Sequence, residues 1–180
     1  MTDRSDIMKE QTIIKANKKY FFFLLLLSIL ICAFCIGCLL LIKPINIFMA
    51  ILSVILAIFS LFGVSLATYR LVGKTPFITI DKTQIIDHSR ITKMPPVKWE
   101  QVEGIYLHSF GQGELVLVVL KDSYEYLQDV PGIYGKFLHS LAKKGLFWLD
   151  FNHKYTTLSK QELYDTLKGY FDEFNNYHAQ

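Results

Sequence analysis

Residues 20–42, YFFFLLLLSILICAFCIGCLLLI, and residues 44–69, PINIFMAILSVILAIFSLFGVSLATY, contain no charged side chain, and only Lys43 separates them. An α-helix rises about 1.5 Å per residue, so each run is long enough to cross a hydrocarbon core about 30 Å thick. The two runs therefore predict a transmembrane hairpin with spans at 20–42 and 45–69. Residues 1–19 are then expected to be a cytoplasmic lead-in, and residues 75–180 a separate domain.

Positively charged side chains flank this hairpin unevenly. The segments outside the spans carry Lys15, Lys18, Lys19, Arg70 and Lys74, whereas the turn between them carries Lys43 alone. Basic residues stay preferentially on the cytoplasmic side of a membrane, and Tyr20 and Tyr69 stand where aromatic rings suit the headgroup layer. Both features predict a multi-pass membrane protein with both termini in the cytoplasm.

A cleaved secretory or lipoprotein signal is the alternative interpretation of the first apolar run. A basic segment, an apolar run and the motif Cys35-Ile36-Gly37-Cys38 follow one another as they do in such signals. Signal peptides are short, however, and normally precede a soluble mature chain. Here a second apolar run follows at once, which favours an uncleaved anchor.

Small side chains recur along one side of each span. They are Ser28, Cys32, Cys35 and Cys38 in the first span, and Ala50, Ser53, Ala57, Ser60, Gly63 and Ala67 in the second. Small residues let transmembrane helices approach closely. We therefore expect the two stripes to face each other, with the cysteines as packing residues and not as a metal or redox site.

The charge of the chain is divided between its two parts. Residues 1–74 hold eight Lys/Arg and three Asp/Glu, whereas residues 75–180 hold eleven and thirteen, so the net charges are +5 and −2. The basic excess thus belongs to the membrane flanks. A domain without a basic surface lacks the main attraction for nucleic acid, and no nucleic-acid partner is expected.

Beyond Pro76 the pattern changes to that of short antiparallel strands. The expected strands are 77–80, 84–88, 97–100, 102–108 and 114–120, with a turn at 81–83 and a further strand at 146–151. A helix is expected from about Asp129 to Lys144, with Gly145 as its C-terminal stop. The chain is therefore assigned to the α+β class.

The last helix has the clearest local signals. Ser159 and Glu162 form a capping box, and apolar residues then recur every three or four positions. These residues are Leu163, Leu167, Tyr170, Phe171, Phe174 and Tyr177. One face of the helix is therefore expected to be buried, and it is suited to cover the open face of the sheet.

Trp99 has two interpretations. In a strand between Lys98 and Glu100, its large ring is expected to point inward as an anchor of the sheet. The alternative is an exposed ring that docks a partner or contacts lipid headgroups.

Four short motifs resemble an uncharacterised bacterial family of small two-span membrane proteins with a cytoplasmic domain similar to pleckstrin-homology (PH) domains. They are TPFITID at 75–81, VKWEQV at 97–102, the run 117–122, and LSKQEL at 158–163. The resemblance implies a curled antiparallel sheet capped by the C-terminal helix, with a helical insertion around 124–144, in a protein of the bacterial inner membrane. It implies no catalytic residues.

No pattern in the sequence indicates catalysis or a cofactor. The five histidines, His88, His108, His139, His153 and His178, are scattered without metal-ligand spacing. Neither a nucleophile elbow nor a glycine-rich dinucleotide loop is present. We therefore expect no enzymatic activity, no metal and no cofactor.

The leading functional hypothesis is a non-enzymatic interaction module anchored at the cytoplasmic face of the membrane, with an immunity-type protein as one form of it. Its expected contacts with an unidentified protein partner are Phe110, Tyr124 and Tyr126. The alternative is a sensor of lipid headgroups, with Arg70, Lys74 and Lys82 as the contacts. The net charge of −2 weakens that alternative, because anionic headgroups are normally recognised by a cluster of basic residues.

Overall fold

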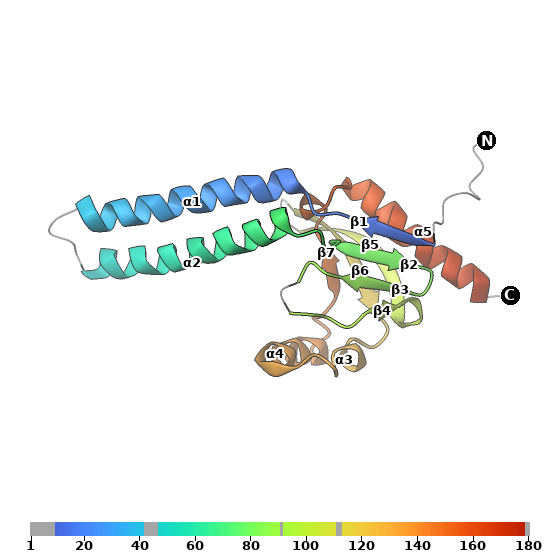
Figure 1. Ribbon diagram of the computed structural model, residues 1–180. Helices are drawn as coiled ribbons and strands as arrows, with labels where there is room; N and C mark the ends of the chain where they lie inside the picture. Colours follow the sequence, from blue (N-terminus) through green and yellow to red (C-terminus); the bar gives the residue numbers. More distant parts are fainter. Residues whose placement is uncertain (1–9, 42–46, 91, 111–112, 179–180) are drawn as a thin grey trace. The chain divides into compact units, whose positions relative to one another are not determined.

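A computed structural model describes residues 10–41, 47–90, 92–110 and 113–178. The chain divides into two compact units (Figure 1). One unit consists of residues 17–74, and the other combines the residues before 17 with those after 74. The described part of the chain is therefore an α+β protein in which one unit is interrupted by the other in sequence.

The unit of residues 17–74 is a pair of long helices, α1 (Lys18–Leu41) and α2 (Ile47–Val72), which run side by side in Figure 1. Both are long and apolar enough to cross a membrane by length and composition. α2 extends beyond the expected end at residue 69 and includes Arg70 in its last turn. Lys43 and Pro44, the expected turn, lie outside the described residues.

The stripes of small residues form the contact between α1 and α2. Ser28 and Cys35 are buried on α1, and Ser53, Ser60 and Ala67 are buried on α2. A Cβ atom added to Gly63 would lie only 2.6 Å from Ser28 Oγ. The packing role expected for the small side chains is therefore confirmed at these positions.

The second unit contains a four-stranded antiparallel sheet in the order β1-β2-β3-β4. Its strands are β1 (Gln11–Ile14), β2 (Ile78–Asp81), β3 (Gln84–Asp87) and β4 (Val97–Lys98). Strands β2 and β3 lie where the sequence predicts them, whereas the strand expected at 97–100 is shorter. It ends because Trp99–Gln101 forms the 3₁₀-helix η2.

Strand β1 corrects the expectation that residues 1–19 are only a lead-in to the membrane. It precedes the helical hairpin, yet it pairs with β2, which follows the hairpin, so that Ile14 lies opposite Ile78. The side chain of Ile14 is only 2% exposed. The domain therefore includes residues on both sides of the hairpin, and the boundary expected at residue 75 describes only part of it.

A second antiparallel sheet contains β5 (Val102–Phe110), β6 (Gly113–Leu120) and β7 (Leu149–Phe151) in that order. Two helices lie between β6 and β7: α3 (Ser123–Tyr126) and α4 (Gly132–Lys143). Gly145, at the expected helix stop, has a φ of +67°, which glycine adopts readily. The 3₁₀-helix η3 (His153–Tyr155) follows β7.

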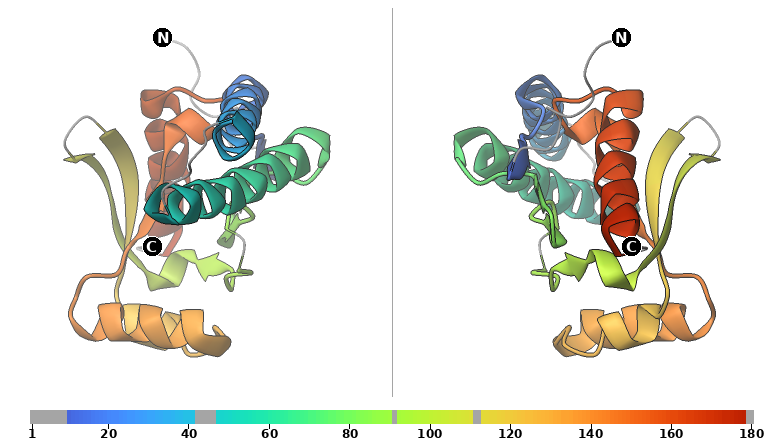
Figure 2. Two further views of the ribbon diagram at one scale, coloured as in Figure 1. Left: turned by 90° about the vertical axis from the view of Figure 1, so that its left-hand side faces the viewer. Right: turned by 90° about the vertical axis from the view of Figure 1, so that its right-hand side faces the viewer.

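Helix α5 (Lys160–His178) closes the domain. Figure 2 shows α5 in red alongside the yellow β5–β6 hairpin. The backbone N–H of Ser159 donates to Glu162 Oε2 at 2.8 Å, and the N–H of Glu162 donates to Ser159 Oγ at 3.3 Å, so the expected capping box is confirmed. Leu163, Leu167, Tyr170 and Phe171 are buried, as the periodicity predicts.

Candidate functional site

The turn between β2 and β3 is fixed by the carboxylate of Asp81. Its Oδ1 accepts hydrogen bonds from the backbone N–H of Thr83 at 2.7 Å and of Gln84 at 2.9 Å, and from Thr83 Oγ1 at 2.6 Å. Partial burial raises the pKa of the Asp81 carboxyl, but these hydrogen bonds outweigh it and hold the pKa below its usual value. The turn therefore has a defined shape and presents Lys82 to solvent.

Trp99 connects this turn to α5. Its indole Nε1 donates to the carbonyl oxygen of Asp81 at 2.8 Å, and its ring stacks on Tyr170 with a centroid distance of 6.2 Å and an interplanar angle of 6°. The hydroxyl groups of Tyr170 and Thr12 are 2.8 Å apart and hydrogen-bonded. The inward position predicted for Trp99 is confirmed, and the exposed alternative is wrong.

The apolar stripe of α5 continues beyond the part of the helix that the sheets cover. Phe174 is half-buried and Tyr177 is 79% exposed, although the periodicity predicts that both are buried. The ring of His178 packs against Phe174 with a centroid distance of 4.1 Å. Phe174 and Tyr177 are more exposed than predicted because the C-terminal end of α5 extends beyond the sheet.

The exposed end of this stripe forms one wall of a hollow of about 670 Å³, which we call the α5 groove. Its other wall is the β2–β3 turn together with β4 and η2. The lining residues are Lys82, Thr83, Gln84, Lys98, Glu100, Tyr170, Glu173, Phe174, Tyr177 and His178. Aromatic rings thus stand beside two lysines and two glutamates in the groove.

The α5 groove contains only one of the six residues that the sequence suggested as contacts, namely Lys82. Arg70 is buried in the last turn of α2, where its guanidinium lies 5.5 Å from the centroid of the Tyr69 ring, and Lys74 is exposed after that helix. The three basic residues belong to different elements. Arg70 and Lys74 belong to the hairpin unit, and of the three only Lys82 belongs to the second unit.

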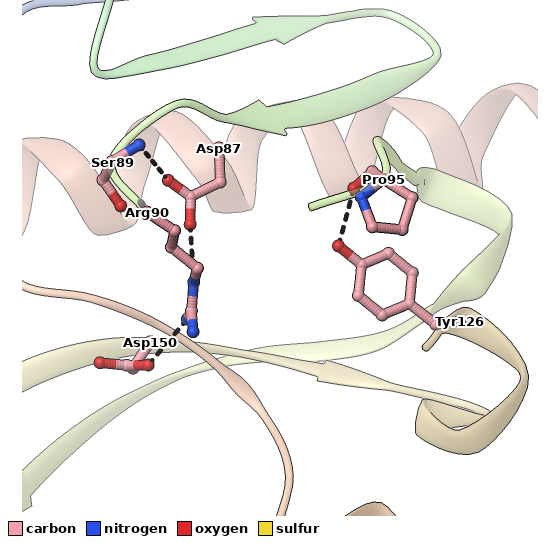
Figure 3. A network of polar contacts seen from close by, with 6 residues as sticks. All are labelled: Asp87, Ser89, Arg90, Pro95, Tyr126 and Asp150. Carbon is pink, nitrogen blue, oxygen red and sulfur yellow. Dashed lines mark hydrogen bonds and ion pairs between the residues drawn. The ribbon is translucent and has the colours of Figure 1, made fainter. Parts of the chain in front are cut away.

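The aromatic residues suggested as partner contacts also separate. Tyr126 is buried and its hydroxyl donates to the Pro95 carbonyl at 2.7 Å, so it belongs to the core (Figure 3). Tyr124 is exposed and borders a smaller hollow beside α4. The side chain of Phe110 lies outside the described residues.

A network of charged groups joins the two sheets next to Tyr126. Asp87, at the end of β3, accepts hydrogen bonds from the backbone N–H of Ser89 at 2.7 Å and from Arg90 Nε at 3.0 Å. Arg90 Nη2 donates to Asp150 Oδ1 on β7, also at 3.0 Å (Figure 3). Burial lowers the pKa of the Arg90 guanidinium, but the two carboxylates raise it more, so the net pKa lies above its usual value.

This network is structural in character. Burial and the Asp87 carboxylate raise the pKa of the Tyr126 phenol far above its ordinary value, although Arg90 lowers it in part. Tyr126 therefore stays protonated and the charges of Asp87 and Arg90 are matched. The arrangement holds the loop after β3 against β7.

His139 has a structural contact as well, since its Nε2 lies 2.7 Å from the Leu127 carbonyl oxygen and its ring packs edge-on against Tyr124. Within the described ranges, no group of three histidine, cysteine, aspartate or glutamate residues is arranged to hold a metal ion.

Comparisons of the chain with protein-family models, with curated proteins and with solved structures give no match. Function is therefore inferred from the geometry of the chain.

Proposed function

We propose that the protein is a non-enzymatic interaction module anchored in a bacterial inner membrane by α1 and α2, with both termini in the cytoplasm. The pairing of β1 with β2 supports this topology. Strands that exchange hydrogen bonds must lie on the same side of a membrane, and two crossings return the chain to the side that it left. The basic flanks of the hairpin favour the cytoplasmic side.

We further propose that the anchored domain is PH-like. A four-stranded and a three-stranded antiparallel sheet, closed by a C-terminal helix, support this proposal. In this view the membrane hairpin occupies the connection between the first two strands. A likeness of fold does not define a ligand; the side chains of the site do.

The α5 groove is the proposed partner site, and the exposed aromatic end of α5 is the observation that carries the proposal. An exposed helix face that is rich in aromatic rings is typical of surfaces that bind another protein. Glu100 and Glu173 oppose the binding of a phosphate beside Lys82 and Lys98. A protein segment with apolar and charged side chains therefore suits the groove better than an anionic headgroup does.

Site-specific photocrosslinking in native membranes tests this proposal. A photoreactive phenylalanine analogue at Tyr177 is expected to capture one defined protein. The matched control is the same analogue at Gln161, an exposed position on α5 that lies about 24 Å away along the helix. Replacement of both Lys82 and Lys98 by Glu should reduce the capture at position 177.

Equal capture at the two positions, or capture of lipid alone at position 177, would contradict the proposed partner site. Extraction of this protein from membranes by alkaline washing would contradict the proposed anchoring.

A further inference from the structure

Helix α4 exposes an apolar face that the rest of its domain does not cover. Ile133 is 89% exposed and Phe137 is 58% exposed, one helical turn further along. Leu141 follows at the same spacing, and it is partly exposed. We call Ile133, Phe137 and Leu141 the α4 patch. At 100° per residue, these three side chains share one face of the helix.

The opposite face of α4 is held firmly to the domain. Gly135 and Leu138 are buried, and a Cβ atom added to Gly135 would lie 1.9 Å from the carbonyl oxygen of Val130. His139 reaches the Leu127 carbonyl from the same side. The close approach at Gly135 therefore fixes the rotation of α4 about its axis, and the α4 patch points outward as a consequence of this packing.

Lysines flank the patch. Lys136 and Lys143 lie on the side of the helix between the α4 patch and the buried face, and Lys144 follows the last turn. Residues 132–148 contain these three lysines and no acidic residue, whereas the domain as a whole carries an excess of acid. The segment of residues 132–148 is therefore positively charged, although the domain as a whole has a net negative charge.

Aromatic and aliphatic side chains extend this surface beyond the helix. Leu146 and Trp148 are exposed, whereas Phe147 and Leu149, which alternate with them, are buried. An amphipathic helix with lysines beside its apolar face, and with tryptophan close by, is typical of segments that lie in a membrane interface.

The hairpin is attached to the domain through the paired strands β1 and β2. Ile14 and Ile78, the strand residues that flank the hairpin, pair with each other, and Ile78 also pairs with Asp87. Asp87 binds Arg90, which also donates to Asp150 on β7, the strand that follows α4 in the chain. Only residues 15–17 connect β1 to α1.

We propose that α4 is an interfacial helix, whose patch of Ile133, Phe137 and Leu141 enters the headgroup layer of an anionic bilayer while Lys136, Lys143 and Lys144 bind the headgroups. This inference rests on the proposed anchoring of α1 and α2. The second attachment would hold the domain at the bilayer surface.

Quenching by brominated lipids tests the contact in the full-length protein. The protein is reconstituted into vesicles of phosphatidylcholine and phosphatidylglycerol with bromines on the upper acyl chain, and Phe137→Trp is introduced in a Trp148→Phe background. Trp99 is buried and gives a constant signal. The tryptophan at position 137 is expected to lose roughly half of its fluorescence, because an interfacial helix lies about 5–10 Å into the headgroup and acyl boundary.

Tyr177→Trp in the same background is the matched control, because Tyr177 is also an exposed aromatic residue but lines the α5 groove. Little quenching is expected there. Replacing Lys136, Lys143 and Lys144 together by Gln should reduce the quenching at position 137, as should high salt. Ile133→Trp provides a second reporter on the patch should Phe137→Trp fail to fold.

Two results would overturn the proposal, and they distinguish a failure of the α4 contact from a failure of the membrane anchoring. If the protein resists alkaline extraction but quenching at positions 133 and 137 does not exceed that at 177, α4 does not contact lipid although the anchoring holds. Formation of dimers in that case would assign the patch to a second copy of the chain. If alkaline washing extracts the protein, the anchoring fails, and the interfacial role of α4 fails with it.

Discussion

Ile14 and Ile78 lie opposite each other as neighbours in an antiparallel ladder, although the whole helical hairpin separates them in sequence. The backbone N–H of Phe77 also donates to the Ile14 carbonyl at 2.8 Å. The domain is therefore completed by a strand that is made before the hairpin. Several measurable consequences arise from this and from the packing around it.

Truncation of Ile14 should destabilise the domain. Ile14→Ala removes a fully buried side chain from β1, and we expect a loss of about 2–5 kcal/mol in the free energy of unfolding. Ile13→Ala is the control, because Ile13 is 55% exposed and should change the stability by less than about 0.5 kcal/mol. Denaturant unfolding of the detergent-solubilised protein measures both. Equal effects would contradict the role of β1 in the core.

Replacing Gly135 and Gly169 by Ala should change the stability in opposite directions. Gly135→Ala places a methyl group against the Val130 carbonyl and should destabilise the protein by about 1–3 kcal/mol, since backbone has to move. Gly169→Ala meets nothing within 4 Å on α5 and should stabilise it by about 0.5–1 kcal/mol. Thermal unfolding decides the signs. A neutral Gly135→Ala would argue against the fixed rotation of α4.

The contact between α1 and α2 should be sensitive to side-chain size at Gly63. Gly63→Leu is expected to separate the helices, because even a Cβ atom lies too close to Ser28 Oγ. Phe62→Leu changes an exposed neighbour and should have no effect. Energy transfer between labels on the two helices in detergent should fall for the first variant alone, and a fall in both would remove the basis for this contact.

The β2–β3 turn should lose stability in acid. The folded pKa of Asp81 is below its usual value of 3.8, so its contribution is fully present above that value and is lost as the pH falls through the lower folded pKa. Asp81→Asn should therefore reduce the dependence of stability on pH below about 4. The control is Asp129→Asn, at an exposed position. An unchanged acid profile in Asp81→Asn would refute the hydrogen-bonded turn.

Tyr170 and Tyr177 lie on the same helix and should respond differently. Tyr170→Ala removes the stack on Trp99 and is expected to cost about 3–5 kcal/mol of stability. Tyr177→Ala should leave the melting temperature almost unchanged, because the side chain is exposed, and should weaken partner capture in the α5 groove. The melting temperature and the crosslinking yield from a reporter at Phe174 separate the two effects.

Local signals in the sequence predicted much of the fold. The capping box at Ser159 and the apolar spacing from Leu163 to Phe171 act within a few residues, and both hold. Trp99 is buried as expected, although it lies in η2 and not in a strand. Lys98 and Gln101 close that turn, because the Lys98 N–H donates to Gln101 Oε1 at 3.1 Å.

Features that depend on distant parts of the chain could not be predicted in this way. Strand β1 is only four residues long, and its partner lies beyond the hairpin. The α5 groove combines the β2–β3 turn with the end of the last helix, so no single stretch indicates it. The sequence analysis also assigned no buried face to the helix at 129–144, because that face depends on the approach of Gly135 to Val130.

The pairing of β1 with β2 has a consequence for biosynthesis. The ribosome releases β1 first, and the strand has no partner until β2 has emerged. If α1 and α2 span the membrane as proposed, the hairpin must enter the bilayer before the two strands can pair. If only one helix inserts, the two strands are left on opposite sides of the membrane and the sheet cannot close. In the proposed topology, completion of the sheet would therefore require correct insertion of both helices, and a misinserted chain would keep an unpaired strand edge that is prone to aggregation.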